Sequence, residues 1–214
     1  MTVSAIIPQA RLRAAKTRLA PALSPRARAA LSLALLRHVC VAVRAVPAVE
    51  GLTIVSPDRA VRGWGEVGGW TVAPDWGSDL NTALRGTMGS PACQGRDLLI
   101  VVADLPWLRA ADVASLLAAS RPGRVVLAPS KDGMGTSALV VPAGHAFAPA
   151  FGPASRAAHH REAGARGLDV VEVFRPGIAF DLDTPDDLAA LEAAQRFDAL
   201  VWDGAGRPVS YSQG

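Results

Sequence analysis

The sequence has few cysteines, few aromatic residues and no long apolar run. Among its 214 residues there are two cysteines, Cys40 and Cys93, too few and too far apart for a disulfide framework or a zinc-binding pattern. The longest apolar stretch, residues 31–43, is interrupted by a serine, an arginine and a histidine. No segment is therefore predicted to cross a membrane. We expect a cytoplasmic protein with no membrane partner and with both cysteines reduced.

Acidic residues are missing from the start of the chain. The first is Glu50, and eight basic residues precede it, although the net charge of the whole chain is only +3. An excess of positive charge of this kind is one property of nucleic-acid-binding arms. No aromatic side chain lies among these basic residues to stack on bases, which favours a local phosphate site. We predict no nucleic-acid partner.

The remaining sequence predicts an α/β fold. Half of the residues are apolar, and the length allows one substantial core. Short β-branched runs alternate with helical patterns, which is typical of a mostly parallel, mixed sheet flanked by helices. The predicted strands are residues 3–7, 52–55, 71–73, 98–103, 125–128, 138–141 and 170–174. One predicted helix begins at Pro25, with Ser24 as its N-cap and an apolar stripe that continues to Val43. The other predicted helices are residues 79–88, 111–120, 155–165 and 184–195. We predict one Rossmann-like domain over residues 1–203 and a flexible tail over residues 204–214.

A basic loop follows the first predicted strand, where open α/β sheets bind ligands. It includes Lys16 and Arg18, and Lys16 is one of only two lysines among the 22 lysines and arginines. A compact ammonium group fits between phosphate oxygens where a planar guanidinium does not. We predict that Lys16 and Arg18 bind a triphosphate and neutralise the charge of departing pyrophosphate. The loop is not a Walker loop, and on spacing alone an ordinary basic surface loop is an equal alternative.

Three aspartates lie after other predicted strands. Asp104 follows the apolar run 98–103, and Asp181 and Asp183 share one side of the segment 180–185 if it is extended. A buried carboxylate is costly without a cation or hydrogen-bond donors, and Mg²⁺ prefers oxygen ligands. The set predicts a Mg²⁺ site. The alternatives are a strand-end turn for Asp104 and stabilisation of the next helix by Asp183.

Two polar loops are candidates for binding anions. Residues 130–136 lie between two predicted strands, where backbone N–H groups can approach an anion. Residues 151–155 lead into a helix whose N-terminus favours a phosphate or carboxylate. On spacing alone, ordinary turns remain the commoner interpretation of both loops.

Short segments along almost the whole chain carry a family resemblance. They are residues 7–8, 14–19, 23–25, 79–81, 103–106, 128–130, 135–136, 151–155 and 180–185. In this order they resemble the CofC/FbiD family, the guanylyltransferases of coenzyme F420 biosynthesis. One departure is that residues 134–137 read Met-Gly-Thr-Ser where the family usually has Gly-Gly-Thr-Asn.

The resemblance implies a GT-A-like nucleotidyltransferase fold and a Mg²⁺-dependent transfer of GMP from GTP. The implied acceptor is 2-phospho-L-lactate, phosphoenolpyruvate or 3-phosphoglycerate, and the labile product would pass to a downstream transferase. The resemblance also implies that Asp104, Asp181 and Asp183 bind Mg²⁺, with Asp104 counted among the catalytic residues beside Lys16 and Arg18. It places the acceptor near three further residues, which are Thr136, Gly152 and Ser155.

Guanine recognition is the least defined part of this prediction. Asp79 and Asn81 are candidates, because a carboxylate accepts hydrogen bonds from guanine N1–H and the 2-amino group, while an amide donates to O6. Two alternatives remain open. One is a nucleotidyltransferase of the same fold that acts on molybdopterin or a sugar phosphate, although such families usually have a Leu-Ala-Gly-Gly loop where residues 8–11 read Pro-Gln-Ala-Arg. The other is a non-catalytic nucleotide-binding regulator.

Overall fold

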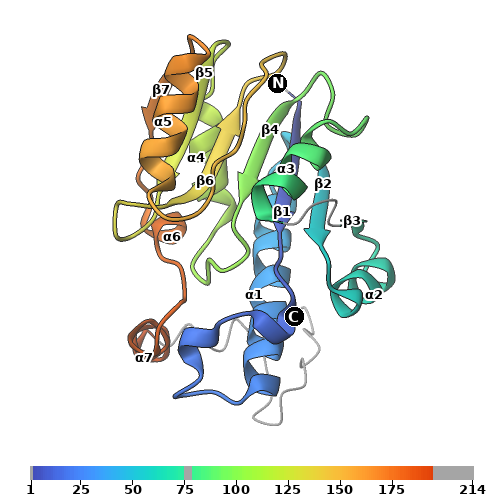
Figure 1. The fold of residues 1–214 in the computed structure, drawn as a ribbon, viewed down its shortest axis with the longest axis vertical. Coiled ribbons are helices and arrows are strands. Elements are labelled where there is room, and N and C mark those ends of the chain that lie inside the picture. Colours follow the sequence, from blue (N-terminus) through green and yellow to red (C-terminus); the bar gives the residue numbers. More distant parts are fainter. Residues whose placement is uncertain (1, 75–78, 195–214) are drawn as a thin grey trace.

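A seven-stranded mixed sheet forms the centre of the molecule (Figure 1). The computed structural model describes residues 2–74 and 79–194, so the predicted tail 204–214 lies outside the described residues. The strands are β1 (Val3–Pro8), β2 (Val49–Ser56), β3 (Thr71–Pro74), β4 (Asp97–Val101), β5 (Arg124–Pro129), β6 (Thr136–Val141) and β7 (Asp169–Glu172). Their order is β3-β2-β1-β4-β6-β5-β7, and β6 is antiparallel to both of its neighbours. Each predicted strand is confirmed, and so is the mostly parallel character of the sheet.

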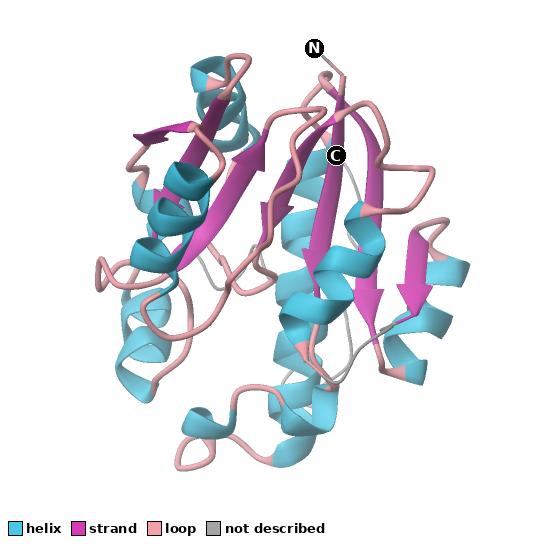
Figure 2. Ribbon diagram, turned by 45° about the horizontal axis from the view of Figure 1, so that its top comes forward, coloured by secondary structure: helices cyan, strands magenta, loops and turns pink. Residues whose placement is uncertain are grey.

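Helices cover both faces of the sheet (Figure 2). The apolar side chains of α1 (Pro25–Arg44), α2 (Arg59–Val67), α4 (Ala110–Ala119) and α6 (Pro176–Ala179) share one core with the sheet. Those of α3 (Leu80–Met88) and α5 (Ser155–Ala165) share the core on the opposite face. The last helix, α7 (Pro185–Ala193), lies near the carboxyl ends of β1 and β4. Helices α2 and α6 were not predicted from the sequence pattern.

The start of α1 follows the capping rules of its sequence. The Ser24 hydroxyl accepts a hydrogen bond from the Ala27 N–H at 3.2 Å, and Pro25 occupies the first helical position. The predicted apolar stripe of Leu31, Leu35, Val39 and Val43 is buried. Burying this stripe against the sheet fixes the direction in which the preceding loop approaches the strand ends.

A small separate core ties the first loop to the C-terminal part of the chain. Leu19 follows β1, Leu31 and Leu35 lie in α1, and Leu182 and Leu188 come from the C-terminal segment. All five are buried. Because Leu182 lies between Asp181 and Asp183, its burial holds both carboxylates close to the basic loop. Within the described ranges, no helix is both long enough and apolar enough to span a membrane.

Candidate active site

The predicted site residues come together at one edge of the sheet. The carboxyl ends of β1 and β4 lie there, beside the first loop and the segment that leads into α7 (Figure 1). Strand β6 is antiparallel to β4, so its first residue, Thr136, also lies at this edge. The backbone N–H of Val102 donates to the Ser137 carbonyl at 3.0 Å and so extends the pairing toward Asp104. Ligands of open α/β sheets bind at such an edge, where neighbouring connections diverge.

Lys16 lies between two of the predicted aspartates. Its Nζ is 2.6 Å from Oδ2 of Asp104 and 2.8 Å from Oδ1 of Asp183. The Lys16 side chain is only 8% exposed. Burial lowers the pKa of this ammonium group, but the charges of Asp104 and Asp183 outweigh burial and the net shift is upward. Lys16 is therefore a buried, fully protonated cation.

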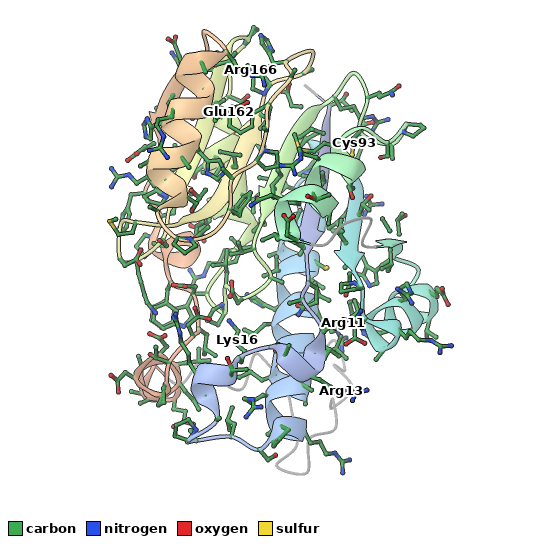
Figure 3. All side chains as sticks on the ribbon, viewed as in Figure 1. Arg11, Arg13, Lys16, Cys93, Glu162 and Arg166 are labelled. Carbon is green, nitrogen blue, oxygen red and sulfur yellow. The ribbon has the colours of Figure 1, made fainter. Side chains whose placement is uncertain are left out.

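The Lys16 backbone adopts an unusual conformation. Its φ of 53° and ψ of 40° are left-handed, a region that non-glycine residues occupy at a cost of roughly 1–2 kcal/mol. Lys16 precedes the 3-10 turn η2 (Thr17–Leu19), and η1 (Leu12–Ala14) lies before it. Figure 3 shows Lys16 on the side of this loop that faces the C-terminal segment, with Arg11 and Arg13 farther away. The strain therefore occurs at the residue that brings the cation to both carboxylates.

Arg18 is held much less tightly than Lys16. Its Nη1 lies 3.9 Å from Oδ2 of Asp183, and its side chain is 75% exposed. An exposed ion pair of this length contributes little to stability. Arg18 is free to reorient toward a phosphate.

Asp181 faces the second lysine of the chain rather than Lys16. Its Oδ1 is 3.6 Å from Lys131 Nζ, which also binds Asp187 Oδ1 at 2.5 Å and lies 5.1 Å from the ring centroid of Phe180. Burial raises the pKa of Asp181, and the charge of Asp104 raises it further, while Lys131 partly opposes both. Burial is the larger cause of this upward shift in pKa, and the negative charge of nearby Asp104 adds to it. Lys131 is the other of the chain's two lysines, and the sequence alone gave it no role.

The helix-capping alternative for Asp183 does not match its contacts. Thr184 is the N-cap residue of α7, and its hydroxyl accepts from the Asp187 N–H at 3.3 Å. The Asp187 carboxylate in turn accepts from the N–H groups of Thr184 and Asp183 at 2.8 and 2.9 Å. The Asp183 carboxylate is thus directed to Lys16 and is not needed to cap the helix.

The three predicted metal ligands are not gathered around one point in this conformation. In the described residues, no group of three or more histidine, cysteine, aspartate or glutamate side chains is arranged to hold a metal ion. The reason is that the Lys16 ammonium separates Asp104 from Asp183. However, Oδ1 of Asp104 and Oδ1 of Asp181 are both buried without a hydrogen-bond partner. Two such carboxylate oxygens fit a cation, and the Mg²⁺ assignment stays a prediction.

A cavity of about 550 Å³ opens beside this cluster. It is bordered by the first loop, α1 and the start of α3, and Lys16, Asp79, Asp104 and Asp183 line it. Asp79 caps α3 by accepting from the Thr82 N–H at 3.0 Å. The cavity is the structure's candidate site for a nucleotide.

Asn81 has a structural contact that its sequence position did not reveal. Its amide donates to the Phe151 carbonyl at 2.9 Å and its oxygen accepts from the Phe151 N–H at 2.7 Å. Both ends of the side chain therefore hold the loop before α5. Its proposed contact with guanine requires that these bonds be shared or broken, and it stays a prediction.

The predicted acceptor residues lie around the start of α5. Gly152 has a φ of 134°, which only glycine adopts readily, and it allows the sharp turn into the helix. Ser155, the first residue of α5, is buried, and its N–H donates to the Gly152 carbonyl at 3.1 Å. Arg156 N–H donates to the Met134 carbonyl at 3.1 Å, so the helix start is joined to the loop before Thr136.

Two backbone N–H groups of the loop 130–136 are already used within the loop. The N–H of Met134 donates to Oδ1 of Asp132 at 2.9 Å, and that of Gly135 donates to the Ser130 hydroxyl at 2.8 Å. Neither group is therefore free to bind an anion in this conformation, and the prediction of an anion site at these two residues is not supported.

Comparison with known proteins identifies relatives of similar length. The profile of the family described as "Guanylyl transferase CofC like" matches residues 3–193. A phosphoenolpyruvate guanylyltransferase of Sphaerobacter thermophilus is 41% identical over 192 residues, which cover 89% of this chain and 93% of that protein. A 3-phospho-D-glycerate guanylyltransferase of Phenylobacterium zucineum is 38% identical over 187 residues, covering 85% and 84%.

Solved structures support the fold at lower identity. A Desulfovibrio desulfuricans protein whose structure is described as a "putative nucleotide-diphospho-sugar transferase" has a TM-score of 0.69 at 16% identity. The match covers 94% of this chain and 97% of that protein. A nucleotidyl transferase from Methanothermobacter has a TM-score of 0.65 at 17% identity, covering 92% and 99%. The predicted nucleotidyltransferase fold is confirmed.

Proposed function

This chain belongs to the CofC-like family of guanylyl transferases, and we propose that it transfers GMP from GTP to a small phosphorylated carboxylic acid, with release of pyrophosphate. The candidate acceptors are 2-phospho-L-lactate, phosphoenolpyruvate and 3-phosphoglycerate, and the pathway is that of coenzyme F420. The observation that carries the proposal is the contact of buried Lys16 with Asp104 and Asp183 beside the 550 Å³ cavity.

The reaction requires positioning and charge neutralisation more than proton transfer. An oxygen of the acceptor's phosphate forms a bond to the α-phosphorus of GTP, and the bond from that phosphorus to the β-phosphate bridge oxygen breaks. The electron pair leaves with pyrophosphate. A phosphate monoester is already largely dianionic at neutral pH, so no general base is needed. Lys16 and Arg18 supply positive charge for the triphosphate, and the walls of the site hold the two reactants in line.

Asp104, Asp181 and Asp183 are the proposed ligands of Mg²⁺. Oδ1 of Asp104 and Oδ1 of Asp181 are buried and accept no hydrogen bond, although the second lies 3.6 Å from Lys131 Nζ, and this supports the proposal. Bound Mg²⁺ would supply a Lewis acid for the phosphate oxygens. The ammonium of Lys16 meanwhile balances part of the carboxylate charge, which otherwise would be a costly concentration of like charges.

We expect a strong preference for GTP over ATP, CTP and UTP. A polar pocket that pairs with a base discriminates against bases that leave its groups unpaired, so the difference in kcat/KM should be about a hundredfold or more. Initial rates of pyrophosphate release with the four nucleotides measure it. Asp79→Asn retains a helix-capping residue and should reduce the preference. Equal turnover with ATP would contradict the assignment.

The acceptor pocket should be separable from the nucleotide pocket by mutation. Replacing Ser155 by Ala or Thr136 by Val removes a hydroxyl from the start of α5 or β6. Loss of one hydrogen bond to a charged group costs about 1.5–3 kcal/mol, so the KM for the acid should rise roughly ten- to hundredfold. The KM for GTP should stay within about twofold. Steady-state kinetics with each substrate varied in turn decides this, and a selective rise in the KM for GTP would mean that the pockets are reversed.

A downstream enzyme is the proposed partner of the reaction. The expected product joins GMP to an acid through a reactive diphosphate linkage, and passing it directly to the next transferase would limit its hydrolysis. The non-catalytic alternative predicts nucleotide binding without pyrophosphate release, so the same assay distinguishes the two.

A further inference from the structure

His159 connects the acceptor site to a neighbouring loop through both of its ring nitrogens. It lies in α5, four residues after Ser155, and is completely buried. The backbone N–H of Ala150 donates to His159 Nε2 at 2.9 Å. On the other side of the ring, Nδ1 lies 2.9 Å from the hydroxyl oxygen of Thr136.

The first of these contacts fixes the proton on the ring. A backbone N–H can only donate, so Nε2 of His159 must carry a lone pair. In the neutral imidazole the hydrogen then resides on Nδ1. The Nδ1–H donates to the Thr136 oxygen, and the hydroxyl hydrogen of Thr136 is not used in this bond. It remains available to a further hydrogen-bond acceptor.

The surroundings of His159 keep the ring neutral. The ring packs against Phe151, with centroids 4.9 Å apart and an interplanar angle of 70°, and its centroid is 6.1 Å from that of Phe147. Burial lowers the pKa of His159 to about 4, with Glu162 opposing the shift and His160 adding to it. At neutral pH the His159 ring is therefore neutral, with its hydrogen on Nδ1 and its lone pair on Nε2.

We propose that His159 is a positioning residue of the acceptor site, which fixes Thr136 as a hydrogen-bond donor to an anionic oxygen of the phosphorylated acid. The inference rests on the proposed function in one respect, namely that Thr136 contacts the acceptor. It adds an expectation about the substrate: because Nδ1–H of His159 donates to the Thr136 oxygen, the hydroxyl hydrogen of Thr136 is directed to a hydrogen-bond acceptor, which a carboxylate or phosphate oxygen of the acid supplies. Ser155, one helical turn before His159, lies on the same side of α5.

A double-mutant cycle tests this coupling. His159→Gln places an amide near the position of Nε2, where it can still bind the Ala150 N–H, but it cannot reach Thr136 as Nδ1 does. Thr136→Val removes the hydroxyl and keeps the shape. We expect His159→Gln to raise the KM for the acid about tenfold, with the KM for GTP within about twofold of the wild type. The double variant should be no worse than Thr136→Val alone, because the only effect of His159→Gln on the acid is through the orientation of the Thr136 hydroxyl, which Thr136→Val already removes.

A neighbouring histidine provides the matched control. His160 is in the same helix but pairs with Glu172 at the surface, so His160→Gln should leave both KM values unchanged. The inference is overturned if the effects of His159→Gln and Thr136→Val multiply in the double variant. It is also overturned if His159→Gln lowers Tm and leaves the KM for the acid unchanged. A rise in the KM for the acid in His160→Gln as large as that in His159→Gln would overturn it too.

Nitrogen NMR of ¹⁵N-histidine-labelled protein tests the tautomer without any turnover. We expect a protonated Nδ1 and an unprotonated Nε2 for His159 at pH 7.5, and the reverse tautomer or a charged ring contradicts the inference. If the wild-type protein releases no pyrophosphate with any of the three acids, the proposed function fails. The NMR result then still decides whether His159 fixes the Thr136 hydroxyl.

Discussion

Asp104→Asn, Asp181→Asn and Asp183→Asn are each expected to lower kcat by about a thousandfold or more. Asparagine keeps the size and one oxygen of the side chain but removes the negative charge that offsets a divalent cation. The triphosphate then loses its electrostatic partner even though the fold is retained. Single-turnover measurements at saturating GTP and several Mg²⁺ concentrations quantify the loss.

The three variants should differ in stability when EDTA removes divalent cations. Asp181 is half-buried and its pKa is raised, so its charge destabilises the folded protein at neutral pH; this cost declines as the pH falls through the raised folded pKa and is gone below the ordinary pKa of an aspartate. Asp181→Asn should therefore melt at or above the wild-type Tm. Asp104→Asn and Asp183→Asn should melt below it, because each removes a partner of buried Lys16.

This difference separates the catalytic interpretation from a structural one. If Asp181 and Asp183 served only to stabilise α7, both substitutions would lower Tm and leave turnover largely intact. Full activity of Asp181→Asn and Asp183→Asn at ordinary Mg²⁺ concentrations would show that this segment is not part of the active site.

Lys16→Met is expected to reduce kcat/KM at least a hundredfold and to destabilise the protein as well. It leaves Asp104 and Asp183 without the cation between them. Breaking a fully buried pair costs about 3–5 kcal/mol, but the two carboxylates are 28% and 36% exposed, so solvent screening reduces the expected cost to about 1–3 kcal/mol. Denaturant unfolding and steady-state kinetics measure the two effects.

Lys16→Arg separates the effect of the positive charge from the effect of the compact ammonium group. It restores the positive charge, so most of the stability should return. A planar guanidinium cannot replace a compact ammonium between two carboxylates and a triphosphate, so turnover should remain low. Wild-type turnover by Lys16→Arg would mean that charge alone, and not the position of Nζ, accounts for the role of Lys16.

The sheet was predictable because its strands are short β-branched runs separated by turn residues. The α1 stripe was equally clear, since Leu31, Leu35, Val39 and Val43 recur every four residues and all are buried. Helix α2 escaped prediction because Gly63 and Gly65 lower its helix propensity. In the structure, Asp58 caps its start by accepting from the Ala60 N–H at 2.8 Å.

The candidate site was predictable as a set of residues but not as a set of contacts. Because lysine is rare in this chain, Lys16 could be predicted as a phosphate-binding residue. Nothing in the sequence indicates that its ammonium group lies between Asp104 and Asp183. Lys131 carried the same signal and was overlooked. The spacing of Ser155 and His159 on one helix face was also available, but the contact of His159 with Thr136 depends on where α5 lies on the sheet, which the spacing does not reveal.

Incubation with GTP, Mg²⁺ and each phosphorylated acid in turn tests the central claim most directly. Pyrophosphate release is followed together with mass spectrometry of the nucleotide product, and the downstream transferase is added to capture a labile diphosphate. We predict pyrophosphate and a GMP–acid adduct in equal amounts with at least one of 2-phospho-L-lactate, phosphoenolpyruvate and 3-phosphoglycerate, and neither without GTP or Mg²⁺. Binding of GTP with no release of pyrophosphate from it in the presence of any of the three acids would contradict the proposed guanylyl transfer.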